Sequence, residues 1–195
     1  GGQRVRLRSS GRETEIRIPW AGAHHAMNVA AAAAAIGAAG VQLRESVTLD
    51  LDPPRGRGSV HVVGAWHVVD ESYNANADSV IAALEAVVER ASGAPTALLL
   101  GAMNELGPFS VDEHARVGRR AAQLGVRLVA AFGAGAEPTA DAASRGGVEA
   151  SFQAEDDSAL WSWLRERLDG GRWWILVKGS RASGMERFLR RFEEG

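Results

Sequence analysis

The stretch that decides how this sequence is interpreted is VVDESYNANADS, residues 68–79. An apolar strand ends here in two carboxylates, and six of the seven residues from 70 to 76 carry hydrogen-bonding side chains. A turn needs only one or two polar residues, often with Gly or Pro, and neither is present. In an open α/β sheet, ligands bind where a strand ends and its helix begins. We therefore predict that this stretch holds a polar ligand.

The composition is that of a globular protein and excludes several classes of function. The chain has 195 residues, of which 46% are hydrophobic, and a formal net charge of −2. It has no cysteine, which excludes disulfides, thiol catalysis and thiolate metal sites. The small net charge gives no reason to expect nucleic acid as a partner. No apolar run is long enough to span a bilayer, so we expect no membrane association and a cytoplasmic location.

A rigid joint separates the first part of the chain from the rest. Residues 3–8 and 14–18 alternate polar and apolar side chains, which predicts an antiparallel hairpin. An alanine-rich helix is predicted over residues 24–39, and a short helix over Leu43–Leu49. The run from 52 to 58, DPPRGRG, cannot continue a helix. We therefore assign residues 1–52 to one domain, 53–58 to an interdomain joint and 59–195 to a second domain.

Beyond the joint, strands and helices alternate with short loops, which predicts a Rossmann-like, mostly parallel sheet flanked by helices. The all-apolar run Trp173–Val177 is typical of a strand covered on both faces. Ser110 and Glu113 have the spacing of a capping box at a helix start. The predicted strands are 59–63, 66–69, 96–100, 127–132, 148–152 and 173–177, and the predicted helices are 78–91, 111–124, 137–144, 156–168 and 184–192.

Polar residues follow four of these strands, and parallel strands bring their carboxyl ends to one edge of a sheet. The four segments are 70–74, 101–105, 133–135 and 178–181. In the last segment, Gly179 lets a ligand approach the backbone, Ser180 can donate a hydrogen bond, and Arg181 can grip a carboxylate or phosphate. Lys178 is the single lysine beside 21 arginines. We favour an anion-binding site over the alternative of a solvated strand end with a helix cap.

Other motifs do not support a site. Gly133-x-Gly135 lacks the third glycine of a dinucleotide fingerprint, so we reject nicotinamide binding. His61 and His67 lie on short strands without an acidic partner in register, so we predict no metal site. For His114 we expect a neutral, packed imidazole.

Four ordered motifs resemble those of the Mur ligases, the ATP-dependent amide-forming enzymes of peptidoglycan synthesis. The resemblance is greatest to the type that adds D-alanyl-D-alanine to the UDP-N-acetylmuramoyl-tripeptide (the MurF type). That type carries Asp-Ser-Tyr-Asn-Ala-Asn, then Gly-Asp-Met-x-Glu-Leu-Gly, then Val-Lys-Gly-Ser-Arg. Three of the matching segments here are 71–76, 101–107 and 177–181. The fourth is 22–28, which corresponds to the family's Gly-x-His-Asn-x-x-Asn helix start, and the family's interdomain Gly-Arg corresponds to residues 56–57.

The resemblance implies a division of labour among these residues. Residues 1–52 would be the tail of a central ATPase domain, and 59–195 the C-terminal domain that brings the amino substrate. ATP and Mg²⁺ would be the cofactors of the complete enzyme, with a UDP-muramoyl-peptide and a D-Ala-D-Ala-like substrate as partners. Asn28 would contact adenine, Arg57 phosphate and Glu71 ribose. The implied nucleotide-binding residues are His24, His25, Asn28, Arg57, Glu71, Tyr73 and Asn74, and the implied substrate-binding residues are Asn76, Asn104, Glu105, Lys178, Ser180 and Arg181.

The sequence also departs from the family pattern. It contains no Gly-x-x-x-x-Gly-Lys-[Ser/Thr] loop, which a Mur ligase needs for the ATP phosphates. We therefore assign no catalytic residue to this chain alone and expect a missing or separate N-terminal half that carries the loop. His25 replaces the family's Asn, and Glu71 and Ala102 each replace an Asp. His25 cannot supply the donor and acceptor of an amide.

Three hypotheses follow. The first is the C-terminal part of a MurF-like amide ligase, which binds the amino substrate and completes the nucleotide site. The second is a non-catalytic binding module, or a subunit that complements a split ligase. The third is a Mur-like ligase of specialised metabolism with a different amino-acid substrate, which the three departures would accommodate.

Overall fold

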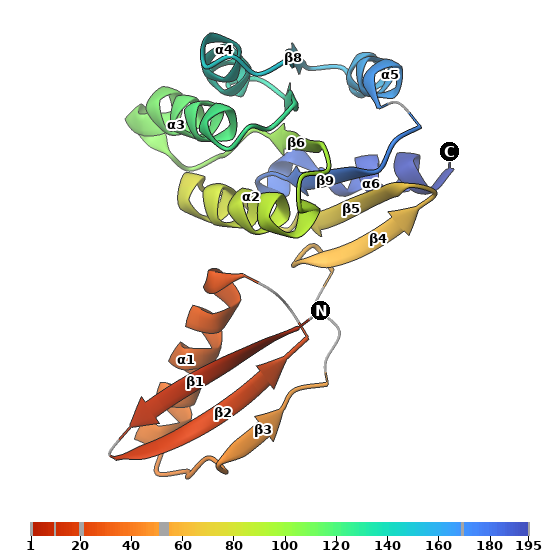
Figure 1. Cartoon of the computed structure of the whole chain (residues 1–195). Coiled ribbons are helices and arrows are strands. Elements are labelled where there is room, and N and C mark those ends of the chain that lie inside the picture. Colours follow the sequence, from red (N-terminus) through yellow and green to blue (C-terminus); the bar gives the residue numbers. More distant parts are fainter. Residues whose placement is uncertain (1, 10, 20–21, 51–54, 169, 195) are drawn as a thin grey trace. The chain divides into compact units, whose positions relative to one another are not determined.

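The computed structural model describes residues 2–9, 11–19, 22–50, 55–168 and 170–194, with the side chain of His24 outside the description. The chain divides into two compact units, an N-terminal unit of Gly1–Pro53 and a C-terminal unit of Pro54–Gly195 (Figure 1). The predicted joint falls partly on residues 53 and 54, which lie outside the described residues. Its Gly56–Gly58 part belongs to the C-terminal unit.

The N-terminal unit is a small sheet with a helix on one face. Strands β1 (Gln3–Ser9) and β2 (Arg12–Ile18) form the predicted antiparallel hairpin, with Val5 opposite Ile16. Val5, Ile16 and Ile18 are buried, while the alternate positions carry exposed arginines. Helix α1 (Ala23–Ala38) packs its inner residues onto this apolar face. Alternation of side chains along the strands therefore places one face of the sheet in the core and the other in solvent.

The helix predicted over Leu43–Leu49 is wrong. Its middle is β3 (Ser46–Thr48), which pairs in parallel with β2. Val47 lies opposite Ile16 and packs into the same core, as do Leu43 and Leu49. Ser-Val-Thr is a poor helix former and a good strand former, and the free edge of β2 supplies the hydrogen-bonding partner.

The C-terminal unit contains a six-stranded sheet in the order β4-β5-β9-β6-β7-β8. Strand β4 is antiparallel to β5, and every other neighbouring pair is parallel. The predicted mostly parallel, Rossmann-like architecture is confirmed. The strands are β4 (Ser59–Val63), β5 (Trp66–Glu71), β6 (Thr96–Gly101), β7 (Leu128–Phe132), β8 (Ala150–Ala154) and β9 (Trp173–Lys178).

Helices cover both faces of this sheet and create two apolar cores. One core lies under α2 and α3 and includes Leu84 and Val117, and the other lies under α5 and α6 and includes Leu160 and Phe188. Every residue of β9 is buried, as its apolar run predicts. The helices are α2 (Ala77–Ala91), α3 (Ser110–Gln123), α4 (Glu137–Arg145), α5 (Asp157–Arg167) and α6 (Glu186–Glu194), with 3₁₀ turns at Gly107–Phe109 and Arg181–Ser183 (Figure 1).

The predicted capping box at Ser110 is also wrong. Ser110 lies inside α3 behind the Gly107–Phe109 turn, and it makes no side-chain cap. The turn already fixes the direction of the chain, and the Ser110 hydroxyl lies 3.4 Å from His114 Nδ1 instead. A reciprocal capping box is found at α2, where Asn76 Oδ1 accepts from the Ser79 amide and Ser79 Oγ accepts from the Asn76 amide.

Candidate functional site

The carboxyl ends of four neighbouring parallel strands form one edge of the C-terminal sheet, as predicted. We call this edge the rim. It comprises residues 70–74 at the end of β5, 178–181 at the end of β9, 101–105 at the end of β6 and 133–135 after β7. Hydrogen bonds continue between the segments beyond the ladders. The Ala102 amide donates to Phe132 O at 2.9 Å, and the Ser180 amide donates to Ala102 O at 3.2 Å. The rim is therefore a continuous, backbone-bonded surface.

Lys178 and Glu71 form a buried ion pair in the rim. The strand register places them opposite each other, with Lys178 Nζ 3.2 Å from Glu71 Oε2 and 2.9 Å from the Asn74 carbonyl. The two residues are only 3% and 9% exposed. Burial lowers the pKa of the Lys178 ammonium, and the charge and hydrogen bond of Glu71 oppose that effect. The single lysine thus holds two rim segments together.

Asp70 organises the backbone around it. Its Oδ1 accepts hydrogen bonds from the Ser72 amide at 3.0 Å and the Ser72 hydroxyl at 2.6 Å, and its Oδ2 accepts one from the Gly56 amide at 2.9 Å. Asp70 and Ser72 are both buried. The motif comparison assigned no role to either residue, although both belong to the opening stretch. The signal that could have identified Asp70 is a carboxylate near the end of a strand, directly after the apolar residues Val68 and Val69.

Two guanidinium groups lie near the ring of Tyr73, which is 45% exposed. The Cζ atom of Arg57 is 4.2 Å from the ring centroid, and that of Arg181 is 6.0 Å from it. Both arginines are exposed, and Arg181 Nη1 also lies 3.6 Å from Glu186 Oε1. The structure therefore brings together one predicted nucleotide-binding arginine and one predicted substrate-binding arginine. We call these three residues the Arg–Tyr–Arg cluster.

Ser180 and Asn104 connect the middle of the rim. The Asn104 amide donates to Ser180 Oγ at 2.7 Å, which uses the buried hydroxyl as an acceptor. The side chains of Asn104 and Glu105 are exposed, and Glu105 has a φ of 64°. Gly179 lets the Arg181–Ser183 turn pack closely against the rim, because a Cβ at position 179 would lie 2.4 Å from Ser183 Oγ.

The two predicted asparagines of the opening stretch have backbone partners. Asn74 Oδ1 accepts from the Ala75 amide at 2.9 Å, and Asn76 Oδ1 is the cap of α2. Both residues are exposed, Asn74 in the rim and Asn76 two positions beyond it. Their roles toward a nucleotide or a substrate stay predictions.

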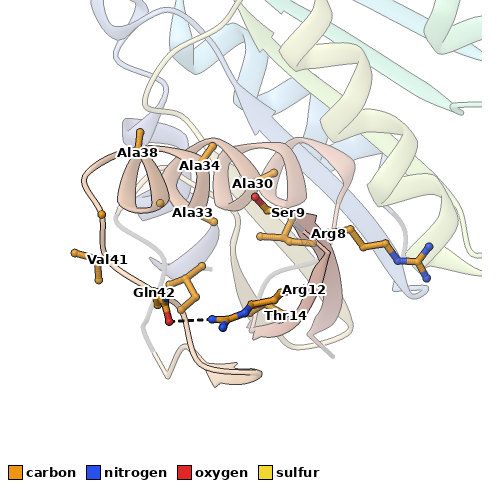
Figure 2. A pocket seen from close by; sticks show the side chains of 14 residues that line it. Arg8, Ser9, Arg12, Thr14, Ala30, Ala33, Ala34, Ala38, Val41 and Gln42 are labelled. Atoms are coloured by element: carbon orange, nitrogen blue, oxygen red, sulfur yellow. Dashed lines mark hydrogen bonds between the residues drawn. The ribbon is translucent and has the colours of Figure 1, made fainter.

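The remaining predicted residues lie in the N-terminal unit. His24, His25 and Asn28 are in the first turns of α1, where Asn28 is exposed and His25 is partly buried. The predicted contact between Asn28 and adenine stays a prediction. A hollow of about 760 Å³ in the same unit lies between the hairpin and α1, and Figure 2 shows its alanine-rich wall and the hydrogen bond from Arg12 to Gln42. It is lined by none of the predicted site residues.

His114 is a buried structural residue, as predicted. Its Nε2 accepts from the Met103 amide at 3.0 Å, and its Nδ1 lies 2.8 Å from Ser110 O, so Nδ1 carries the proton and the ring is neutral. His61 pairs with Val68, so it has no acidic partner in register, as predicted. Its Nδ1 lies 3.4 Å from Glu193 Oε1 of α6. Among the described residues, no three His, Asp or Glu side chains gather in a way that could hold a metal ion. No helix in the described part of the chain is long and apolar enough to cross a membrane.

A mostly parallel sheet with helices on both faces and polar residues at the carboxyl ends of its strands defines a Rossmann-like α/β domain. Residues 56–181 match the family profile described as "Mur ligase, glutamate ligase domain". The chain belongs to the Mur ligase family.

Curated relatives and solved structures are MurF-type ligases. The UDP-N-acetylmuramoyl-tripeptide--D-alanyl-D-alanine ligase of Treponema pallidum is 35% identical over 176 residues, which are 88% of this chain and 38% of that protein. The ligase of the same name from Escherichia coli is 30% identical over 92% of this chain and 39% of its own length. The chain thus spans about two fifths of these relatives.

The fold comparison agrees with the sequence comparison. A crystal structure of MurF from Acinetobacter baumannii matches all of this chain and 42% of its own, with a TM-score of 0.78 and 26% identity. MurF ligase from Thermotoga maritima, whose structure is a complex with ADP, matches with a TM-score of 0.78 at 22% identity, which supports the fold alone.

Proposed function

We propose that this chain is the C-terminal part of an ATP-dependent amide ligase of peptidoglycan precursor synthesis. In such a ligase it would receive a D-alanyl-D-alanine type amine and complete the nucleotide site. The observation that carries the proposal is the convergence of the three rim motifs, residues 71–76, 101–107 and 177–181, on one surface. The named relatives support the choice of reaction.

The chemistry needs two anions beside each other. A carboxylate is activated by phosphoryl transfer from ATP, and the amine displaces the phosphate, so developing negative charge must be stabilised. Arg57 would contact the phosphate and Arg181 the carboxylate of the incoming dipeptide, since a guanidinium suits both groups. The Arg–Tyr–Arg cluster places these two cations around one ring. Lys178 would act indirectly, because its ammonium is buried against Glu71.

The described residues suit ATP better than they suit Mg²⁺. The exposed guanidinium groups, together with the NH₂ groups of Asn74 and Asn104, suit the oxygens of ATP and of a dipeptide. The described residues offer no carboxylate cluster for Mg²⁺. Mg²⁺ would therefore be held by nucleotide phosphates and by residues of the part that carries a phosphate-binding loop.

A complementation experiment tests the proposal. The chain is mixed with the N-terminal part of a MurF ligase, and phosphate release is measured with ATP, UDP-muramoyl-tripeptide and D-alanyl-D-alanine. We expect turnover only when both parts are present. Turnover by this chain alone would contradict the assignment of the phosphate-binding loop to a missing half. Failure with every N-terminal part, combined with retained dipeptide binding, would support a non-catalytic binding module instead.

A different amino substrate is the second candidate, and one observation favours it. Ala102, which replaces a motif Asp, packs with Ala131, Ala136 and Ala140 in a small apolar cluster. The rim therefore has a methyl group where the MurF-type motif has a carboxylate. Substituting other D- and L-dipeptides in the complementation assay tests this candidate, and a preference for D-alanyl-D-alanine over all of them would contradict it.

A further inference from the structure

The Gly56–Gly58 segment is fastened to the end of β5 by a set of hydrogen bonds centred on Asp70. The Gly56 amide donates to Asp70 Oδ2 at 2.9 Å, and the Gly58 amide donates to Asp70 O at 2.7 Å. In the other direction, the Tyr73 amide donates to Gly56 O at 3.2 Å. Arg57 is thus held between two residues whose backbone is fixed to Asp70 and Tyr73.

The fit between this segment and Tyr73 leaves no space for a side chain at position 56. Gly56 has a φ of 77°, which favours glycine. A Cβ at this position would lie 2.7 Å from the Tyr73 amide nitrogen and 2.9 Å from Tyr73 Cβ. The close approach brings the Arg57 guanidinium to 4.2 Å from the ring centroid.

We propose that Asp70 is a positioning residue, whose buried carboxylate holds Arg57 and Tyr73 in place so that the Arg57 guanidinium, near the same ring as Arg181, binds a phosphate-bearing anion. Only the class of ligand, a phosphate-bearing anion, is taken from the proposed function; the positioning role of Asp70 is argued from the hydrogen bonds above. Asp70 itself contacts no ligand, because its two oxygens are used by Ser72 and Gly56 in a buried position.

An amide cannot replace this carboxylate. All three groups that contact the Asp70 oxygens are donors, two backbone amides and one hydroxyl. In Asp70→Asn, the side-chain NH₂ would face at least one N–H, which leaves a buried donor unsatisfied. The Gly56–Gly58 segment would then separate from β5 and take Arg57 away from the ring.

The sign of the effect separates positioning from simple electrostatics. If Asp70 acted only through its charge, its removal would strengthen anion binding, because the Coulomb repulsion between the carboxylate and the anion would be lost. Loss of the positioning contact has the opposite effect, because the Arg57 guanidinium is no longer held where it meets the anion. A weaker affinity in Asp70→Asn would therefore point to geometry and not to charge.

The probe is inorganic pyrophosphate, and the reporter is Tyr73, the single tyrosine of the chain. Incorporation of 3-fluorotyrosine gives one ¹⁹F resonance, which is followed during a pyrophosphate titration. We expect saturable binding in the wild type, and in Asp70→Asn a shifted resonance with the affinity lowered by about tenfold. Gly56→Ala, which pushes the segment away from the other side, should produce the same two changes.

Two matched variants serve as controls. Asp156→Asn makes the same substitution at another carboxylate that accepts a backbone amide, at the start of α5. Leu160→Ala removes a buried side chain from the core under α5 and α6, so it lowers the stability of the unit without touching the Asp70 contacts. Both should keep the wild-type resonance position and affinity.

The proposal is overturned if folded Asp70→Asn and Gly56→Ala bind pyrophosphate within twofold of the wild type with an unchanged resonance. It is also overturned if the wild type shows no Tyr73 response to pyrophosphate. If Asp70→Asn does not fold, Gly56→Ala decides. These readouts need no turnover, so a failed complementation assay with intact pyrophosphate binding would reject the proposed function and leave this inference standing.

Discussion

Lys178 and Glu71 carry opposite charges in a place where neither charge is solvated. Removing one partner of a buried pair leaves the other charge uncompensated, which costs about 3–5 kcal/mol in measured cases. Replacing both with neutral side chains of similar size costs much less. The pair therefore couples the ends of β5 and β9 more strongly than an exposed salt bridge would.

We predict that Lys178→Met lowers the free energy of unfolding by about 3–5 kcal/mol, and that Glu71→Gln combined with Lys178→Met recovers most of the loss. Urea denaturation of the two single variants and the double variant gives the coupling. Arg191→Met, at a partly exposed pair with Asp157, is the matched control and should change stability by about 1 kcal/mol or less. Additive losses in the double variant would contradict the buried pair.

The pKa of Lys178 predicts a dependence of stability on alkaline pH. Its folded pKa lies below the ordinary value of 10.5, so between the two values the unfolded chain binds one proton more than the folded chain. The free energy of unfolding contributed by this group therefore rises with pH across that window. We expect denaturation curves in alkaline buffers to show this rise for the wild type relative to Glu71→Gln/Lys178→Met. A difference that stays flat or falls with pH would refute the lowered pKa.

The sequence predicts which residues occupy the rim, but not which of them are buried. The motifs correctly indicate that Tyr73, Asn104 and Arg181 follow strands, whereas Lys178 is the last residue of β9. The burial of Lys178 depends on β9 lying directly beside β5, although the two residues of the pair are 107 positions apart. Local sequence patterns do not reveal that β9 lies between β5 and β6 in the sheet, because strand order is set by long-range packing.

At the scale of single elements, local signals compete with their surroundings. Strong patterns predict their elements close to the observed bounds. The apolar run Trp173–Val177 corresponds to β9, and the amphipathic residues 78–91 correspond to α2. The short segment at β3 was not, because an available edge strand outweighs a weak helical pattern. At Ser110 the sequence has the spacing of a cap, but the preceding 3₁₀ turn changes the backbone there.

The cap at α2 leads to a test of the Asn76 role. Asn76→Ala should destabilise the C-terminal unit by about 1 kcal/mol, whereas Asn76→Asp keeps a capping oxygen and should be nearly neutral. Ser110→Ala is the matched control, since Ser110 caps nothing, and its effect should stay within about 0.5 kcal/mol. Thermal denaturation monitored by circular dichroism ranks the three. If Asn76→Ala were no more destabilising than Ser110→Ala, the observed cap would contribute nothing.

Gly118 determines how closely α3 and α4 pack. A Cβ at this position would lie 2.2 Å from Thr139 O and 2.9 Å from the Ala143 amide nitrogen. We predict that Gly118→Ala destabilises the C-terminal unit by about 1–3 kcal/mol, because overpacking outweighs the better helix propensity of alanine. Gly37→Ala in α1, where a Cβ meets nothing within 4 Å, should instead stabilise its own unit by up to about 1 kcal/mol. Urea denaturation of both variants checks the opposite signs, and stabilisation by Gly118→Ala would contradict the close packing.

At the scale of the whole molecule, the two units differ in the size of their cores. Among the described residues of the N-terminal unit, the buried apolar side chains are Val5, Ile16 and Ile18, on one face of a three-stranded sheet. The C-terminal unit has two large cores on the two faces of six strands. Because stability grows with buried apolar area, the two units should open with different free energies.

Hydrogen exchange of the whole chain, followed by mass spectrometry, tests this difference. We expect peptides from β1 and β2 to exchange at least about tenfold faster than peptides from β6 and β9, whose residues are all buried. Leu98→Ala, in the core under α2 and α3, should speed exchange in β6 and β9 and leave β1 and β2 unchanged, because a unit that opens separately responds only to substitutions in its own core. Val5→Ala should do the reverse. Equal protection of all four strands, or acceleration in both units by either variant, would mean that the chain unfolds as one cooperative body. Separate opening would in turn mean that a partner contacting only one unit stabilises that unit alone.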